Sequence, residues 1–429
     1  MRSRDELAAG GAPGKTSGAT WEMAGIVLLA LYVTAGVIYS AVLPQVARFP
    51  DEVEYPLLSN NLLHGPGYSM DGVHLTACRA PGYAFFLAGI VAGGGGYFIF
   101  RAAQFLLLGA TIILLGRLCA ERRMFAGLFI TTGLVICYPL FFYMGGTLYP
   151  QIVSGFLFVL ALALMLATPR GLALNLAAGG VFGSLILVVP TFLFTLAVVL
   201  GMALLLKLVR WRDALWVTAA AALVVGAWTS RNAIVFHQFV PIASNSGANF
   251  LLGNNEEAKA NEATANYGTV PYDEQVQKLG LDEFERDRFY RDAALTWIRT
   301  HPGDALVLYL EKVLNFFNIT NVYSSRIHDE VTPWKEDVMA VSYLLLLGLL
   351  GWRLLDLKQY PFVPREKLLL AVYVLSAFTS AIFFTRIRHR LPYDFLIVAV
   401  IAFYLSRRAE AWMAAKRSSN RAERVGRKK

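Results

Sequence analysis

The sequence is short of charge. Only 16% of its 429 residues are Asp, Glu, Lys or Arg, whereas 56% are hydrophobic. An ordinary soluble domain carries about a quarter charged residues. This shortage excludes a typical soluble protein and predicts an integral membrane protein.

Cysteine is also scarce. Cys78, Cys119 and Cys137 lie in three separate segments without CxxC spacing, which argues against a disulfide framework or a structural zinc site. His64 and His74 are the other metal candidates, but no carboxylates stand at matched spacing, so we interpret them as surface polar residues. We therefore expect no metal site.

Acidic residues are fewer than basic ones. Thirty Asp and Glu against 39 Lys and Arg give a net charge of +9. In a soluble protein this excess could indicate nucleic acid binding. In a membrane protein it usually records topology, so we expect membrane lipids and no nucleic acid as partners.

Long apolar runs predict an all-α polytopic membrane protein of about ten transmembrane helices, because one bilayer crossing takes about 20 residues. We predict residues 1–21 to be a disordered cytoplasmic leader, followed by a retained first span and not by a cleaved signal peptide. The runs lie at about 22–44, 97–118, 124–142, 148–168, 171–188, 190–207, 213–230, 337–355, 366–384 and 391–406.

The distribution of positive charge sets the predicted topology. With the N-terminus inside, the inner loops and the basic tail at 407–429 collect most of the Lys and Arg residues, as cytoplasmic segments do. Both termini are then cytoplasmic. The two long polar segments, at about 45–96 and 231–336, lie outside, and loops of this length are usually functional.

The first outer loop carries the leading catalytic candidate. A helix is expected from Asp51 to His64, lying in the interface, with Gly65-Pro66-Gly67 as its stop. Asp51 lies at the end of the apolar stripe on this helix, at the bilayer boundary. An ionisable group in that position usually has a function. Glu54 is interpreted as a first-turn charge that complements the helix dipole.

Arginines near the outer boundary are candidates to bind an anion. Arg79 precedes a short apolar run at 83–92 that is too short to span the membrane and is predicted to be re-entrant or interfacial. A guanidinium suits a phosphate, although Arg79 could equally reach lipid headgroups. Three further arginines oppose the positive-inside trend at the outer end of the ninth span and have the same two interpretations: Arg386, Arg388 and Arg390.

These segments together resemble one family. Asp51-Glu52, Gly65-Pro66-Gly67-Tyr68 and Arg79-Ala80-Pro81-Gly82-Tyr83 resemble the first outer loop of GT-C glycosyltransferases related to protein O-mannosyltransferases and aminoarabinose transferase. The resemblance continues over about 45–400, at Trp228–Asn232, Ile242–Asn255, Asp282-Glu283, His301-Pro302, Lys312 and Arg386–Pro392. No single motif is specific, but their order is shared.

The resemblance implies a GT-C transferase domain at 22–406 in a bacterial cytoplasmic membrane, with the active site on the outer, periplasmic face. Such an enzyme moves one sugar, with inversion, from a polyprenyl-phosphate donor to a glycan or glycolipid acceptor of the cell envelope. Asp51 is the implied general base with Glu52 as helper, and Arg79 is the implied phosphate ligand. The position of Arg386, Arg388 and Arg390 at the outer boundary makes donor phosphate their first candidate ligand as well. The residues assigned to substrate binding are Tyr55, Tyr83, Arg231, Asn245, Asn249 and Asn254, although the asparagines could equally form plain turns.

Two departures from the family pattern limit this interpretation. Many relatives have an acidic residue near the start of the fourth span, where this chain has Gln151, and an Arg-Pro pair where it has Val189-Pro190. No cofactor is required, and a divalent cation is compatible with the sequence but unsupported, since Asp51 and Glu52 alone cannot fill its coordination shell.

Other functions stay open. A lipid-linked sugar flippase or other transporter is the competing class, although no internal repeat is evident. A polysaccharide polymerase or ligase would also use outer loops. The sequence identifies neither the sugar, nor the acceptor, nor the oligomeric state.

Overall fold

The computed structural model describes residues 15–49, 51–118, 126–260, 269–320 and 333–426, and for residues 15–18, 51, 270, 333 and 417–426 it describes the backbone alone. The described residues are built from helices. Their bounds are α1 (Lys15–Val42), α2 (Asp51–His64), α3 (Pro81–Ala92), α4 (Tyr97–Leu118), α5 (Gly127–Ile136), α6 (Leu140–Gly145), α7 (Gln151–Met165), α8 (Leu172–Val188), α9 (Phe192–Leu205), α10 (Trp211–Phe236), α11 (Ser246–Gly253), α12 (Val270–Leu279), α13 (Glu283–Thr300), α14 (Pro302–Phe316), α15 (Pro333–Leu355), α16 (Pro364–Ser380) and α17 (Ile387–Gly426).

The prediction of an all-α multi-pass membrane protein is confirmed. Each predicted apolar run coincides with a helix or with a broken pair of helices. Within the described ranges, four helices are long and apolar enough to cross a membrane, at Ala19–Val42, Tyr97–Leu118, Trp211–Phe236 and Trp334–Leu355. The remaining apolar helices, such as α7 and α9, are shorter.

Three predicted boundaries differ from the structure. The third run, at 124–142, is divided into α5 and α6 around Pro139, because proline has no N–H to continue a helix. Helix α1 begins at Lys15, so the end of the predicted leader is helical, while residues 1–14 lie outside the description. Helix α17 continues from the last span through the basic tail to Gly426.

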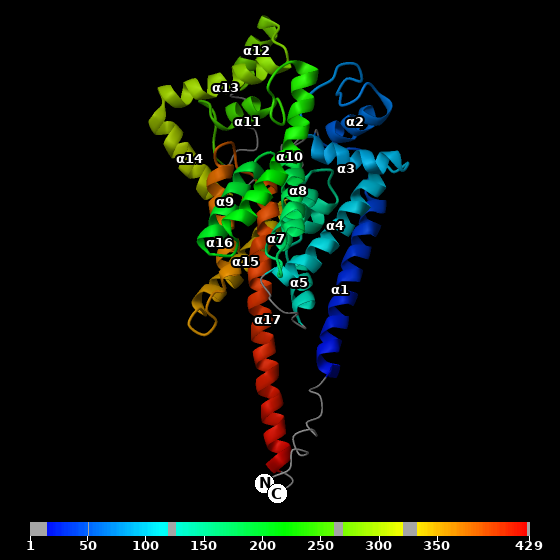
Figure 1. Cartoon of the computed structure of the whole chain (residues 1–429), viewed down its shortest axis with the longest axis vertical. Helices are drawn as coiled ribbons and strands as arrows, with labels where there is room; N and C mark the ends of the chain where they lie inside the picture. The colour runs from blue at the N-terminus through cyan, green and yellow to red at the C-terminus, as the bar shows by residue number, and fades with distance from the viewer. Residues whose placement is uncertain (1–14, 50, 119–125, 261–268, 321–332, 427–429) are drawn as a thin grey trace.

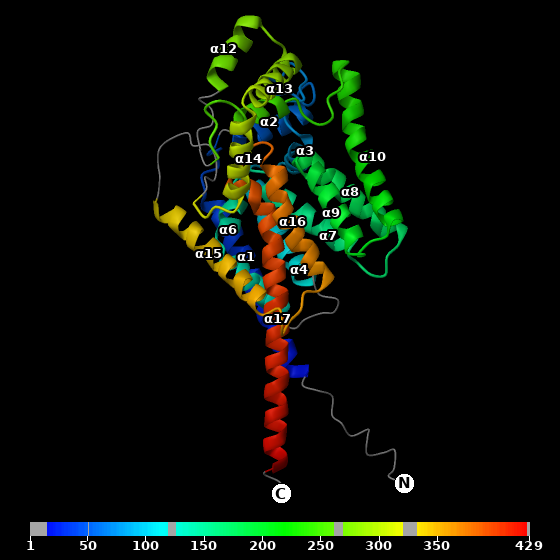
Figure 2. The same cartoon turned by 90° about the vertical axis from the view of Figure 1, so that its left-hand side faces the viewer.

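Helix α17 is the central element of the fold. Its upper half packs against α4, α5, α7, α15 and α16, and its lower half extends beyond the bundle (Figures 1 and 2). The packing of α7 on α17 is close. A Cβ at Gly155 would lie 2.4 Å from the ring of Phe395, so only glycine permits this approach.

Arg353, which the predicted topology assigns to an inner loop, is buried in the structure. It lies near the end of α15 and is fully buried, with Nε and Nη2 donating to the two carboxylate oxygens of Glu366 at 2.9 and 3.0 Å. A buried arginine usually requires such a bidentate partner. This pair therefore fastens the turn between α15 and α16.

The helices of both long loops gather at one end of the bundle. Helices α2 and α3 and helices α11–α14 lie at the same end of the molecule, opposite the start of α1 and the end of α17 (Figures 1 and 2). The predicted helix from Asp51 to His64 and the predicted short apolar helix after Arg79 are both present, as α2 and α3. The fold thus brings the two chemically distinctive loops together.

Candidate active site

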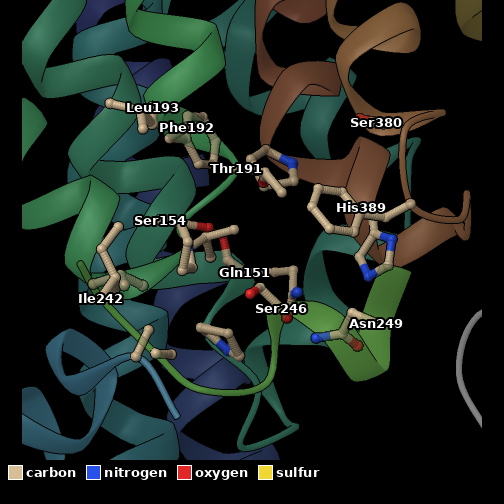
Figure 3. Close-up of a pocket in the computed structure, with 18 of the residues that line it drawn as sticks. Gln151, Ser154, Thr191, Phe192, Leu193, Ile242, Ser246, Asn249, Ser380 and His389 are labelled. Carbon is tan, nitrogen blue, oxygen red and sulfur yellow. The ribbon is translucent and has the colours of Figure 1, made fainter. Parts of the chain in front are cut away.

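A cavity of about 380 Å³ lies where several membrane helices end at the loop-bearing face. It is bounded by the start of α7, the connection from α8 to α9, helix α11 and the segment between α16 and α17 (Figure 3). Irregular backbone is tolerated at membrane depth where it lines a cavity. The polar residues of its lining are Tyr55, Arg79, Tyr149, Gln151, Ser154, Thr191, Asn245, Ser246, Asn249, Ser380, Arg388, His389 and Tyr393.

Glu52 anchors the start of α2. Its side chain is fully buried, and its two oxygens accept hydrogen bonds from the backbone N–H groups of Arg48, at 2.6 Å, and Leu148, at 2.8 Å. A carboxylate engaged by two amides is held in place and is not open to a substrate. These contacts give Glu52 a positioning role. Asp51 is the first residue of α2, but its side chain lies outside the description.

Arg79 lines the cavity and is ion-paired. Its Nε lies 2.5 Å from Glu54 Oε2, and both side chains are about one quarter exposed. Glu54 is therefore a partner of Arg79 in addition to a first-turn charge of α2. The Tyr68 hydroxyl donates to the Arg79 carbonyl at 3.0 Å, which holds this residue against the loop.

The three arginines after the ninth span have different positions. Arg388 lines the cavity, with its guanidinium 4.8 Å from the centre of the Tyr149 ring. Arg386 is 3% exposed, lies against the Phe384 ring and is outside the cavity lining. Of these two arginines, the structure therefore places Arg388 at the cavity and Arg386 outside it.

Arg390 belongs to a buried polar network. It forms an ion pair with Asp394 at 3.2 Å, donates to the carbonyls of Phe316 and Asn318, and lies 3.6 Å from the centre of the Tyr343 ring. Asp394 also accepts a hydrogen bond from Tyr138 at 2.8 Å. With all these partners inside the protein, Arg390 is not available to a ligand in the cavity.

Two further predicted contact residues are structural. Arg231 lies against the rings of Trp228 and Phe236 and donates to the Thr76 carbonyl at 3.1 Å, so it fastens α10 to the first loop. Tyr83 is fully buried, with its hydroxyl donating to Gln104 and its ring 4.9 Å from Tyr55. Of these aromatic residues, Tyr55 is the one that lines the cavity.

The predicted asparagines of the second loop also fall into two groups, those that line the cavity and one whose contacts lie within the protein. Asn245 and Asn249 line the cavity from the start of α11. Asn254 is buried, donates to the Ile382 carbonyl at 3.0 Å and accepts from Lys312. Asn254 therefore joins the end of α11 to the segment that follows α16.

Lys312 completes this junction. Its buried Nζ donates to the carbonyls of Gly253 and Phe383, each at 2.9 Å, and burial lowers the pKa of Lys312 to about 8. A Cβ at Gly253 would lie 1.9 Å from the Phe383 carbonyl oxygen. The wall formed by α11 is thus held tightly against the segment that carries Arg388.

Glu283 joins the two outer loops. Its carboxylate accepts hydrogen bonds from the Thr76 hydroxyl at 2.6 Å, from the Ala77 N–H at 2.9 Å and from the Ser244 hydroxyl. Each of these donors lies in a loop next to the cavity lining. The sequence placed Glu283 in a family-like stretch but gave no sign of this contact.

Replacing Glu283 with alanine should lower the free energy of unfolding by about 2 kcal/mol or more, because a charged acceptor of three donors is lost. Thermal unfolding in detergent and limited proteolysis of the outer loops measure this effect. Glu274 is exposed and forms an ion pair within α12, so Glu274→Ala should change stability by less than about 0.5 kcal/mol. Equal effects of the two substitutions would contradict the bridging role.

Several lining residues escaped prediction. They are Gln151 at the start of α7, Thr191 just before α9, Ser246 on α11 and Tyr393 on α17, and they meet only in the folded chain. One feature of the sequence could have indicated these lining residues. Pro150 and Pro190 each stand near the boundary of an apolar run. Both prolines line the cavity, since helices that end at membrane depth leave room for it.

Comparison with known proteins gives distant structural similarities. No family model matches the chain, and no curated protein matches it. The crystal structure of ArnT from Cupriavidus metallidurans bound to undecaprenyl phosphate is 12% identical, with 91% of this chain and 77% of that chain aligned and a TM-score of 0.44. The archaeal oligosaccharyltransferase AglB from Archaeoglobus fulgidus, in complex with an inhibitory peptide and a dolichol-phosphate, is 14% identical over 92% of this chain and 52% of that chain, with a TM-score of 0.49.

These similarities concern the fold alone. The structural comparison therefore carries no argument about activity. At 12% and 14% identity it transfers no residue role to this chain.

Proposed function

We propose that this protein is an inverting glycosyltransferase that moves one sugar from a polyprenyl-phosphate carrier to a glycan or glycolipid acceptor of the cell envelope, on the outer face of the cytoplasmic membrane. The proposal rests on a cavity that combines arginine, amide and hydroxyl side chains at the ends of membrane helices. Donors of this class present a phosphate and a sugar together, and such a lining has groups for both.

An apolar groove beside the cavity supports a lipid-linked donor. The groove has a volume of about 540 Å³, lies between α8, α9 and α10, and is lined by Ile186, Leu196, Ala221, Val225 and Phe239 among others. Leu193 lines both the groove and the cavity. A polyprenyl chain can therefore lie in the groove while its phosphate reaches the polar cavity, which a soluble nucleotide sugar would not need.

In this mechanism the residues have distinct roles. Asp51 acts as the general base that takes the proton from the acceptor hydroxyl as it attacks the anomeric carbon. Arg388, with Arg79 beside its partner Glu54, stabilises the negative charge of the departing polyprenyl phosphate. Glu52 fixes the start of α2 through its two backbone hydrogen bonds, and Tyr55, Asn245 and Asn249 contact the sugars.

The decisive experiment incubates the purified protein in nanodiscs with a panel of undecaprenyl-phosphate monosaccharides and lipid or glycan acceptors. Release of undecaprenyl phosphate together with transfer of labelled sugar supports the proposal. Passage of an intact lipid-linked sugar across a vesicle membrane without hydrolysis or transfer would instead identify a flippase. Absence of turnover with every donor would contradict the glycosyltransferase proposal.

Arg388→Gln should lower kcat/KM for the donor by about a hundredfold, as removal of one transition-state donor does, whereas Arg388→Lys should retain part of the activity. Arg286 is exposed on α13, so Arg286→Gln is the matched control and should keep wild-type activity. Wild-type kcat/KM in Arg388→Gln would refute the assignment of Arg388 to the phosphate.

A further inference from the structure

Gln151 presents a buried acceptor that the protein itself leaves unsatisfied. The residue is 6% exposed, and its Oε1 has no hydrogen-bond partner within the described part of the chain. Buried polar atoms are nearly always paired, so an exception calls for an explanation. The simplest explanation is a partner that arrives with the ligand.

Gln151 lies at the wall of the cavity. It is the first residue of α7 and belongs to the cavity lining. Figure 3 shows it in the middle of the lining residues, between Ser154 on its own helix and Ser246 and Asn249 on α11. The Ser154 hydroxyl already donates to the Gln151 carbonyl at 3.0 Å, so that backbone contact does not involve Oε1.

The charge of the cavity identifies the partner as a neutral donor. Arg79 and Arg388 lie in the lining, and no Asp or Glu is among its described residues. A cation would therefore meet like charge, and an anion cannot donate to Oε1. A hydroxyl group satisfies both requirements, because it is neutral and donates one hydrogen bond.

We propose that Gln151 selects the sugar by accepting a hydrogen bond from one of its hydroxyl groups. This inference rests on the proposed glycosyltransferase function and adds a specificity-determining residue to it. A site built to hydrogen-bond a hydroxyl discriminates strongly against an analogue that lacks it, because the buried acceptor then stays unpaired. Glutamine suits this role better than glutamate, since a carboxylate in the same lining as Arg388 would compete with the phosphate for that guanidinium.

The test compares sugars that differ in a single hydroxyl. Undecaprenyl phosphates carrying glucose, mannose, galactose or arabinose, each with its single-deoxy analogues, are offered to wild type, Gln151→Met, Gln151→Glu and Gln277→Met. Both binding, by competition against undecaprenyl phosphate, and transfer are measured. Gln277 is exposed on α12, so its replacement makes the same chemical change outside the cavity.

Wild type and Gln277→Met should prefer the sugar with its full set of hydroxyls over one deoxy analogue by about tenfold or more. In Gln151→Met this preference should fall to about one, while the binding of undecaprenyl phosphate alone is unchanged. Gln151→Glu keeps an acceptor oxygen and should retain the preference with weaker binding of undecaprenyl phosphate.

The two proposals fail in different ways. If Gln151→Met retains the same preference at every hydroxyl, the selection role of Gln151 is overturned even though transfer proceeds. If wild type binds the lipid-linked sugars but transfers none, the glycosyltransferase proposal fails, and the binding preferences still decide the role of Gln151. If wild type binds no lipid-linked sugar at all, both proposals are overturned.

Discussion

Replacing Asp51 with asparagine should reduce sugar transfer by on the order of a hundredfold or more. Asparagine has nearly the same shape as aspartate but cannot accept the proton of the attacking hydroxyl, so the loss measures general-base catalysis. The measurement is kcat/KM with a polyprenyl-phosphate sugar that the wild type uses. The KM for the donor should change much less than kcat.

Asp71 offers a matched control in the same loop. Its carboxylate accepts hydrogen bonds from the N–H groups of Val73 and His74, and the hydrogen bond with the His74 side chain holds the pKa of Asp71 well below its usual range. Asparagine keeps an acceptor oxygen for these amides, so Asp71→Asn should remain within about twofold of wild-type activity. Near-normal turnover in Asp51→Asn would refute the assignment of the base.

Replacing Asp394 with leucine should lower the free energy of unfolding by about 3–5 kcal/mol, because it leaves the buried Arg390 without its counter-charge. Asp394 is fully buried and touches Arg390 and the hydroxyls of Tyr138 and Tyr373. Chemical or thermal unfolding in detergent measures the loss. The network joins α15, α16 and α17 to the segment before α6, so its disruption should also loosen the segment that carries Arg388.

The double replacement Arg390→Met with Asp394→Leu separates charge from packing. Removing both partners of a buried pair is often close to neutral, whereas removing one is strongly destabilising. We therefore expect the double variant to recover most of the stability lost in Asp394→Leu. A double variant as unstable as the single one would indicate that packing, and not the unpaired guanidinium, causes the loss.

The membrane helices were predictable because the bilayer imposes a local rule. Every backbone amide at that depth must be hydrogen-bonded within its own segment, so an apolar run of sufficient length becomes a helix wherever it lies in the chain. The run at 97–118 corresponds to α4, and the proline-bounded stretch from Asp51 to His64 corresponds to α2. Helix breaks at Pro139 were harder to predict, because the flanking residues are equally apolar.

The site was predictable only in part. The sequence selected Tyr55, Arg79, Asn245, Asn249 and Arg388, all of which line the cavity. It also selected Tyr83, Arg231, Asn254, Arg386 and Arg390, whose contacts lie within the protein. The same residue types occur in both groups, so composition and motif could not separate them.

Arg388 and Arg390 show the reason most directly. They stand two residues apart at the start of α17, and because an α-helix has 3.6 residues per turn, such neighbours point to nearly opposite faces. One face meets Tyr149 and the cavity, and the other meets Tyr343 and Asp394. Which face is which depends on where distant helices pack.

The sequence by itself determined the helical, membrane-spanning character of this protein and the two loops that carry its polar chemistry, because burial in lipid is a property of each segment alone. The tertiary structure decided which side chains meet at the cavity, because that depends on contacts between residues far apart in the chain. Gln151 illustrates the difference. In the sequence this position showed only the absence of a carboxylate, whereas in the folded chain Gln151 lines the cavity and its Oε1 has no hydrogen-bond partner among the described residues.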